Sequence, residues 1–191
     1  MLVMVLCLAA VVSPLFALRW PAGLLLNRWR WPLLIWVTLA VQVAAVEVDM
    51  PHGLAAILHV LTYVVAVGFL WANRRATGMW IVVAGALSNG VVIALNGGTL
   101  PASKAATAAA GIDSDLAFAN AGVLENPVLP WLGDVFAWPA PLPLANTFSV
   151  GDVLIVVGVW VAAWSGTRRF GAAGAAEATD VAAARTDAER P

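Results

Sequence analysis

Residues 85–103 read GALSNGVVIALNGGTLPAS, an apolar, helix-like run that stops sharply. Asn89 and Asn96 are seven residues apart in this run, so they lie on one face of a helix. The helix is predicted to end at the Gly97-Gly98 turn. Because an amide side chain in hydrocarbon is costly unless it finds a hydrogen-bond partner, the asparagine face must contact protein or water. We therefore expect a binding site on this face.

The composition around this stretch is that of an integral membrane protein. Of 191 residues, 62% are hydrophobic and only 11% are charged, whereas soluble proteins carry about 25% charged residues. The apolar blocks predict an all-α membrane protein with five transmembrane helices, over residues 2–18, 32–48, 54–71, 79–96 and 150–165. One membrane domain is expected over residues 1–166, followed by a disordered cytoplasmic tail over residues 167–191.

The arginines predict the orientation of the helices. Of the ten Lys and Arg residues, Lys104 alone falls on one side of the five-span arrangement. The other nine share the opposite side: Arg19, Arg28, Arg30, Arg74, Arg75, Arg168, Arg169, Arg185 and Arg190. The positive-inside rule then places the N-terminus outside and the C-terminus inside in a multi-pass membrane protein.

This topology leaves a 53-residue extracytoplasmic cap, residues 97–149, between spans four and five. After Pro101, the sequence SKAATAAAG predicts a short helix that stops at Gly111. A second short helix, capped by Asp113 or Ser114, is expected to run through Asn120. Five prolines in residues 126–143 predict an extended path there. The cap is expected to fold back over the helices.

Several polar residues converge on the outer half of the membrane and form the candidate binding site. They are Asn89, Asn96, Gly97, Gly98, Asp134, Ser149 and Asp152. Each group also has a structural interpretation that stays open. Asn89 suits an interhelical hydrogen bond and Asn96 a helix stop. Ser149 and Asp152 have the spacing of a capping box at the start of the last span.

Other polar residues favour packing over chemistry. Span three carries His59, Thr62 and Tyr63 on one helical face, which predicts a packing seam between helices. The single Cys7 cannot form an internal disulfide and is interpreted as a structural thiol. No metal site is predicted. The polar cluster at the outer end of span two is interpreted as solvated, with a divalent-ion site as the weaker alternative: Glu47, Asp49 and His52.

Three linked motifs resemble the bacterial membrane family called domain of unknown function 5317. They are an NGG-x-MP-type turn, an LGD-x-x-x-x-P stretch and an S-x-GD entry to the last helix. The turn is matched by Asn96, Gly97, Gly98 and Pro101, with Leu100 where methionine is frequent; the others are matched by Leu132, Gly133 and Asp134, and by Ser149, Gly151 and Asp152. The resemblance covers nearly the whole chain except the tail, and it implies no activity.

A fainter similarity connects the chain with lipoprotein signal peptidase, an intramembrane aspartyl protease. GALSNGVV and TFSVGD look similar to segments that carry its two aspartates. The first of these aspartates aligns with Val92 here, so the dyad that activates water is incomplete. Under this alternative alone, Asp134 and Asp152 are catalytic candidates.

The sequence favours a non-enzymatic binding protein or membrane-complex component of unknown biochemical function, with a polar pocket in the outer leaflet. Its expected partners are the lipid bilayer and a lipid, a peptide or another membrane protein. An intramembrane aspartyl hydrolase is the alternative, and a small transporter is the third hypothesis. No cofactor is predicted, and the few juxtamembrane basic residues exclude nucleic acid as a partner.

Overall fold

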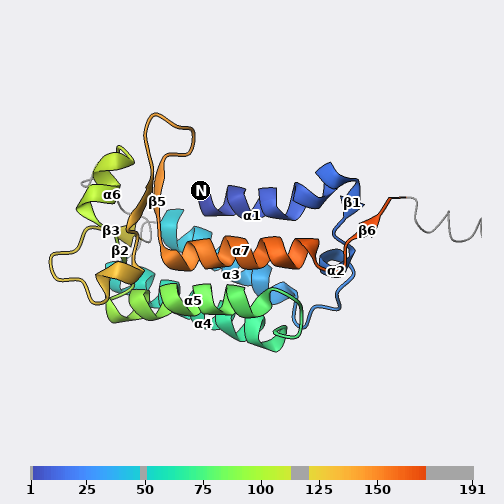
Figure 1. The fold of residues 1–191 in the computed structure, drawn as a ribbon. Helices are drawn as coiled ribbons and strands as arrows, with labels where there is room; N and C mark the ends of the chain where they lie inside the picture. Colours follow the sequence, from blue (N-terminus) through green and yellow to red (C-terminus); the bar gives the residue numbers. More distant parts are fainter. Residues whose placement is uncertain (1, 48–50, 113–120, 171–191) are drawn as a thin grey trace, which may run out of the picture.

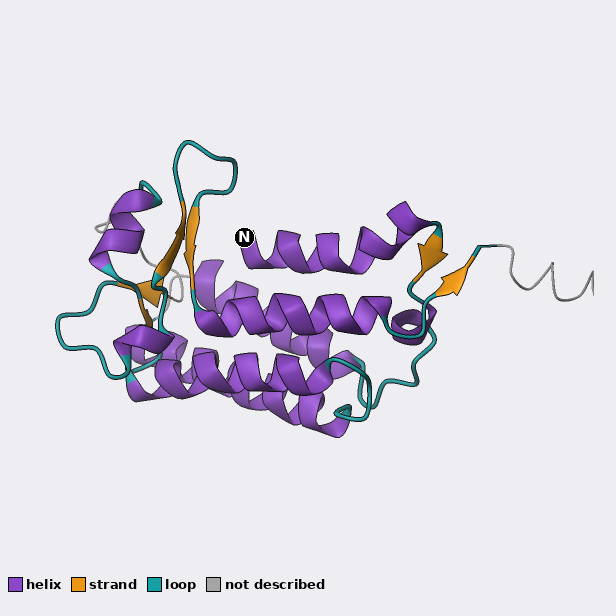
Figure 2. Cartoon of the chain, viewed as in Figure 1, coloured by secondary structure: helices purple, strands orange, loops and turns teal. Residues whose placement is uncertain are grey.

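The computed structural model describes residues 2–47, 51–112 and 121–170, and of residues 42–47 and 52 it describes the backbone alone. Helices dominate, and short strands pair at both ends of the helical bundle (Figures 1 and 2). The helices are α1 (Leu2–Val12), η1 (Ser13–Ala17), α2 (Ala22–Leu25), α3 (Leu33–Glu47), α4 (His52–Ala72), α5 (Met79–Leu95), α6 (Lys104–Ala109), η2 (Pro130–Leu132) and α7 (Val150–Trp164). The strands are β1 (Arg19–Trp20), β2 (Leu100–Pro101), β3 (Ala121–Gly122), β4 (Phe136–Trp138), β5 (Asn146–Phe148) and β6 (Arg168–Arg169).

The long helices pack in the order α3, α4, α5, α7 and α1, and α5 with α7 forms the most extensive contact. α5 lies between α4 and α7 and buries both flanks, through residues such as Val82, Val83, Val92 and Ile93. α1 and α3 are at the edges of this arrangement and expose many apolar side chains. Four helices match the expected apolar blocks closely: α3, α4, α5 and α7. The first expected span, residues 2–18, is divided into α1 and η1, because Pro14 follows the end of α1 at Val12.

One helix passes a test of length and hydropathy for crossing a membrane. Among the described residues this is Gly53–Ala72, with a mean hydropathy of 2.2. The segments Leu2–Ala17, Met79–Leu95 and Val150–Trp164 are apolar but shorter. In the part of the chain that the structure describes, the fold is mostly helical and has one helix that is long and apolar enough to span a bilayer.

The segment between α5 and α7 is a small folded unit at one end of the bundle (Figure 1). β2 pairs in parallel with β3, and β4 pairs antiparallel with β5. α6 begins at Ser103, whose side chain accepts a hydrogen bond from the amide of Ala106, and a left-handed residue at Gly111 follows it. The short helix predicted there is confirmed. The helix expected to start at Asp113 or Ser114 lies outside the described residues.

Two sequence expectations need correction. Residues 126–143 are not uniformly extended, because η2 forms at Pro130 and a β-hairpin begins at Phe136. The tail does not start at residue 167, because Arg168 and Arg169 of β6 pair with Trp20 and Arg19 of β1. The hairpin that begins at Phe136 and the strand β6 both depend on pairing with another strand, which the apolar pattern of the sequence does not reveal.

Candidate functional site

Asn89 of α5 is joined to the start of α7 by side-chain hydrogen bonds. Its Nδ2 donates to Oδ1 of Asp152 at 2.9 Å, and its Oδ1 accepts from Oγ of Ser149 at 2.9 Å. Ser149 and Asp152 form a reciprocal capping box, with backbone-to-side-chain bonds of 2.9 and 3.0 Å. Asn89 and Ser149 are fully buried. We call these three residues the outer polar seam, and they confirm both the interhelical bond and the capping box expected from the sequence.

Glycines let α5 and α7 approach closely enough for these bonds. A Cβ atom on Gly151 would lie 2.6 Å from Cγ of Asn89 and 2.8 Å from the carbonyl oxygen of Gly85. One on Gly158 would lie 2.6 Å from a methyl carbon of Val82. Small residues at helix interfaces allow such close backbone approach. The polar seam is therefore built on a glycine-lined helix contact.

Asp152 occupies the third position of α7 and is surrounded by donors rather than by a cation. Its two carboxylate oxygens accept from the amide of Asn89 and from the backbone N–H of Ser149. Its charge also meets the positive end of the α7 dipole. Both carboxylate oxygens of Asp152 therefore have hydrogen-bond donors from the protein itself.

Asp134 follows η2 in the cap and has a buried carboxyl that is only half satisfied. Its backbone N–H donates to the carbonyl of Pro101 at 2.8 Å, and its carbonyl accepts from Ser103 N–H at 3.0 Å. Oδ2 accepts from the hydroxyl of Thr147 on β5 at 3.0 Å. Oδ1 is buried and has no hydrogen-bond partner within the described part of the chain. Asp134 is 5% exposed, so water reaches this oxygen poorly.

Burial raises the pKa of the Asp134 carboxyl from 3.8 to about 7. The charge of nearby Asp152 also raises this pKa, while the hydrogen bond from Thr147 lowers it. Desolvation and a neighbouring like charge both disfavour a carboxylate. Asp134 therefore changes its charge near neutral pH, whereas an ordinary surface aspartate is ionised there.

This environment predicts that the protein loses stability as the pH rises from about 4 to about 7. The folded state holds the Asp134 proton over this range and the unfolded state releases it, so the free energy of unfolding falls with pH. The slope from one such group reaches about 1.4 kcal/mol per pH unit. Unfolding of the purified protein in mixed detergent micelles, followed from pH 4 to pH 8, measures it.

Asp134→Asn is expected to flatten this pH dependence, because the amide does not titrate. Glu125→Gln is the matched control, since Glu125 is an exposed acid in the same cap segment. It should keep the wild-type slope. Equal slopes in wild type and Asp134→Asn would contradict the assigned environment of Asp134.

Asn96 attaches the cap to the end of α5. Its Nδ2 donates to the carbonyls of Val92 and Val128 at 2.8 and 2.9 Å, and its Oδ1 accepts from Val128 N–H at 2.8 Å. Gly98 adopts a positive φ of 93° against Ala56 of α4. The carbonyl of Gly98 lies 2.7 Å from Nδ1 of the buried His59. The turn at residues 96–98 is thus a structural junction, and Asn96 is the helix stop that the sequence favoured.

The structure divides the predicted site residues into two groups. Asn89, Ser149 and Asp152 come together in the outer polar seam, and the charge of Asp152 acts on Asp134. Asn96, Gly97 and Gly98 belong to the cap junction, and Asn96 shares no hydrogen bond with Asn89. Although seven-residue spacing puts both asparagines on one helical face, α5 ends at Leu95 and Asn96 turns toward the cap.

The sequence interpretation missed Thr147, which is the hydrogen-bond partner of Asp134. Tyr63 of α4 packs against Gly90 beside Asn89, as the predicted packing seam implied. Thr147 carries no local signal, because its role depends on the β4–β5 hairpin. The seven-residue spacing of Gly78 with Gly85, and of Gly151 with Gly158, could have indicated the helix contact. Predicted polar residues Glu47, Asp49 and His52 have side chains outside the described part.

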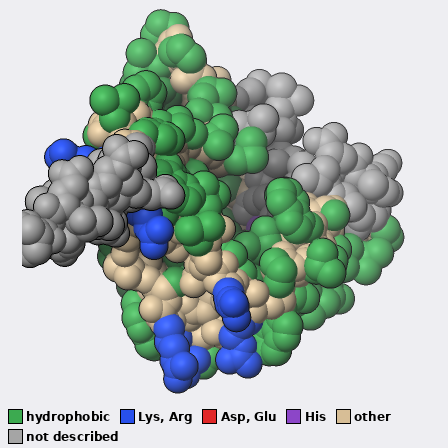
Figure 3. All heavy atoms as spheres, turned by 90° about the vertical axis from the view of Figure 1, so that its right-hand side faces the viewer, with side chains coloured by type: hydrophobic (Ala, Val, Ile, Leu, Met, Phe, Trp, Pro, Cys, Tyr) green, Lys and Arg blue, Asp and Glu red, His purple; other side chains and the backbone are tan. Residues whose placement is uncertain are grey.

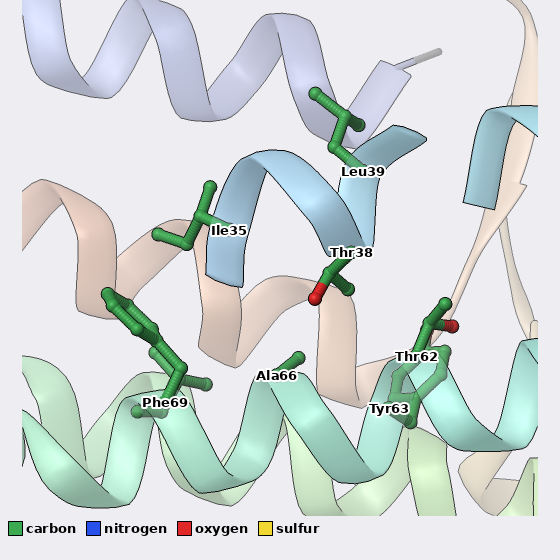
Figure 4. A pocket seen from close by; sticks show the side chains of 8 residues that line it. Ile35, Thr38, Leu39, Thr62, Tyr63, Ala66 and Phe69 are labelled. Carbon is green, nitrogen blue, oxygen red and sulfur yellow. The ribbon is translucent and has the colours of Figure 1, made fainter. Parts of the chain in front are cut away.

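A pocket of about 340 Å³ lies between α3 and α4 (Figure 4). Its walls are mostly apolar, and Tyr63 connects it to the neighbourhood of Asn89. The lining residues are Ile35, Thr38, Leu39, Thr62, Tyr63, Ala66, Phe69 and Leu70. This pocket differs from the polar outer-leaflet pocket expected from the sequence, and it contains none of the predicted binding residues.

The geometry gives little support to aspartyl hydrolysis. Such catalysis uses two carboxyls that share a proton. In the described part of the chain, Asp152 is engaged by Asn89 and Ser149, and Asp134 bonds to Thr147 without a direct bond to Asp152. Among the described residues, no group of three or more His, Cys, Asp or Glu side chains is arranged to hold a metal ion.

The three motifs that link the chain to a known family meet around the cap: Pro101 bonds to Asp134, and Thr147 connects Asp134 to the start of α7. A family model described as a family of unknown function, DUF5317, matches residues 26–164. The chain belongs to the DUF5317 family. The similarity of this DUF5317 protein to lipoprotein signal peptidase is not shown by the comparisons.

An uncharacterised protein of Thermotoga maritima is similar to this DUF5317 chain, with 32% identity over 95 residues. The match covers 49% of this chain and 54% of the relative, so it spans about half the length of either protein. No solved structure matches the chain. The family assignment therefore brings no established activity.

Proposed function

We propose that this chain is a non-enzymatic, multi-pass protein of the bacterial inner membrane that binds a ligand at the junction of its cap and helices. In this proposal α1, α3, α4, α5 and α7 cross the membrane, with the N-terminus outside. The apolar composition, the exposed apolar faces of α1 and α3, and the placement of nine of the ten basic residues on one side of the five-span arrangement support it. α5, with 17 residues, is about 25 Å long and α7, with 15 residues, is about 22 Å long, against a hydrocarbon core of about 30 Å; local thinning of the bilayer accommodates this mismatch.

The unpaired Oδ1 of Asp134 is the observation that carries the binding proposal. A buried acceptor without a partner costs free energy, and a ligand donor can recover that cost. Asp152 adds negative charge nearby, and the described acids of this region have no basic side chain in contact with them. The chemistry favours a ligand that carries both positive charge and N–H donors, such as a primary ammonium group on a lipid or peptide.

Ethylammonium is a suitable probe for this site, because it presents such a group without a large body. At pH 8, where Asp134 is mostly ionised, we expect it to raise the thermal unfolding temperature of the detergent-purified protein. The rise should be about 3 °C at ten times the Kd. Tetramethylammonium has equal charge but no N–H donor, so it should give a much smaller shift.

Asp134→Asn should abolish the response to ethylammonium, whereas Glu125→Gln should retain it. The response should also weaken at pH 5, because the protonated Asp134 has lost its charge. The binding proposal is rejected if both ammonium ions act equally on wild type and Asp134→Asn. The proposal is supported if ethylammonium raises the unfolding temperature of wild type and Glu125→Gln but not that of Asp134→Asn.

A further inference from the structure

Four arginines gather at the end of the bundle opposite the cap, where the linker before α3 meets the turn between α4 and α5. Arg28, Arg30 and Arg75 are exposed and Arg74 is half-buried. Figure 3 views this end, and it shows basic side chains with apolar groups around them and no acidic side chain among the coloured atoms. The described acids with positioned side chains lie in the cap segment or at the cap end of α7: Glu125, Asp134 and Asp152.

Asn73 brings the two arginine-bearing segments together. Its Oδ1 accepts from the backbone N–H of Arg30 at 2.8 Å, and its Nδ2 donates to the carbonyls of Arg30 and Phe69 at 3.1 and 2.8 Å. Asn73 is 6% exposed, so this two-way amide pairing is shielded from water. It holds the linker of Arg28 and Arg30 against the turn that carries Arg74 and Arg75. The cluster is therefore positioned by the fold, and is more than a set of independent flexible charges.

Tryptophans contact two of the four guanidinium groups, those of Arg30 and Arg74, and flank them with apolar surface. The guanidinium of Arg74 lies 4.8 Å from the ring centre of Trp71 and donates to the Trp71 carbonyl at 2.9 Å. Arg30 lies 5.7 Å from the ring centre of Trp31. Trp71 also contacts Trp80 edge to face at 5.2 Å. All three rings are at least half exposed, and such amphipathic rings suit the headgroup layer of a bilayer.

We propose that Arg28, Arg30, Arg74 and Arg75 form a binding site for the phosphate of an anionic phospholipid in the cytoplasmic leaflet. This inference rests on the proposed membrane placement but not on ligand binding at Asp134. The guanidinium fork matches phosphate oxygens, and a guanidinium that stacks on a ring still has N–H groups to donate, although Arg74 uses one nitrogen on the Trp71 carbonyl. The exposed tryptophans beside the arginines favour a lipid over a free anion, because a lipid brings acyl chains to cover the rings.

Native mass spectrometry of the detergent-purified protein, mixed with phosphatidylglycerol and phosphatidylcholine, measures the preference for the anionic lipid. We expect wild type to retain phosphatidylglycerol preferentially. The double variant Arg30→Gln/Arg74→Gln should reduce this preference on the order of tenfold, because both stacked guanidinium groups are lost. Excess inorganic phosphate should displace little of the bound phosphatidylglycerol.

Arg168→Gln/Arg169→Gln is the matched control. It removes the same charge from the same end of the molecule, but β6 lacks the Asn73 pairing and the stacked tryptophans. This control should retain most of the lipid preference. Equal losses in the two double variants, or complete displacement by inorganic phosphate, would overturn the site.

These experiments distinguish failure of the arginine lipid site from failure of the proposed ligand binding at Asp134. The ethylammonium response depends on Asp134 at the other end of the bundle, and it should persist in Arg30→Gln/Arg74→Gln. If the membrane placement is wrong, the wild-type protein will not co-migrate with lipid nanodiscs at all. Loss of lipid selectivity with intact nanodisc insertion would reject the arginine site alone.

Discussion

Replacing Gly151 by alanine is expected to destabilise the protein by about 2–3 kcal/mol, because the new methyl group has no room between α5 and α7. The added Cβ would lie 2.6 Å from Cγ of Asn89 and 2.8 Å from the carbonyl oxygen of Gly85. Neither neighbour can withdraw easily, because Asn89 is held by Ser149 and Asp152 and the Gly85 oxygen is backbone. The helices must separate or the hydrogen bonds of Asn89 must break. Reversible unfolding in mixed micelles measures the loss.

Gly68→Ala provides the matched control for this prediction. Gly68 is also within a helix, α4, but a Cβ there meets no atom within 4 Å. Alanine should therefore be neutral or stabilise the helix by about 0.5–1 kcal/mol. If both substitutions have the same effect, the close α5–α7 contact at Gly151 is not an energetic constraint.

Asn89→Leu is expected to cost about 2–3 kcal/mol, although leucine is similar in size and far more apolar. The substitution leaves Oδ1 of Asp152 without its amide donor and the hydroxyl of Ser149 without its acceptor. A buried group that loses its partner carries its full desolvation cost, and the cost is larger for a charged group. This value exceeds the average of about 0.6 kcal/mol for interhelical hydrogen bonds in membranes, because Asn89 serves two partners, one of them charged.

Ser88→Ala is the matched control for Asn89→Leu. It tests whether any substitution at this point of α5 lowers the stability, or only one that removes the hydrogen bonds of Asn89. Ser88 precedes Asn89 in the chain, and its hydroxyl is buried without a hydrogen-bond partner in the described structure. Removing that hydroxyl should be neutral or mildly stabilising. An Asn89→Leu variant as stable as Ser88→Ala would show that the outer polar seam contributes nothing to the fold. Retained ethylammonium binding in Asn89→Leu would separate the seam from the ligand site.

The Asp134 ligand site and the outer polar seam depend on the same junction, where the cap meets the helices. The carbonyl of Pro101 accepts from Asp134, and Gly133 allows this approach because a side chain there would press on Pro101. Thr147 then connects the Asp134 carboxyl to the strand that leads into α7. A ligand at Oδ1 of Asp134 would therefore act on the segment that positions Ser149 and Asp152. Binding and stability are expected to be coupled for this reason.

Much of the helical framework could be predicted from the sequence because its signals are local. Continuous apolar blocks indicated α3, α4, α5 and α7 to within a few residues. The capping box of Ser149 and Asp152 joins residues three apart, and Asn96 ends its own helix. Such interactions close over one helical turn, so spacing alone reveals them.

Spacing along the chain could not predict the hydrogen-bond partners of the candidate site residues, because these partners are far away in the sequence. Asn89 and Asp152 are 63 residues apart, and Asn73 meets Arg30 across 43 residues. Nothing near Thr147 in the chain indicates that it will bond to Asp134, because the contact exists only when β4 and β5 pair. The face shared by Asn89 and Asn96 was also misleading, since the end of α5 sends the second asparagine toward Val128.

The asparagine stretch of residues 85–103 illustrates this division. The sequence by itself determined that an apolar helix would form there and stop at Asn96, because hydrophobic periodicity and glycine turns act through neighbouring residues. Only the tertiary structure decided that Asn89 bonds to α7 and Asn96 to the cap. It also left one oxygen of Asp134 buried and unpaired. The physical reason is that a buried polar group takes whichever partner the packing of distant segments brings to it.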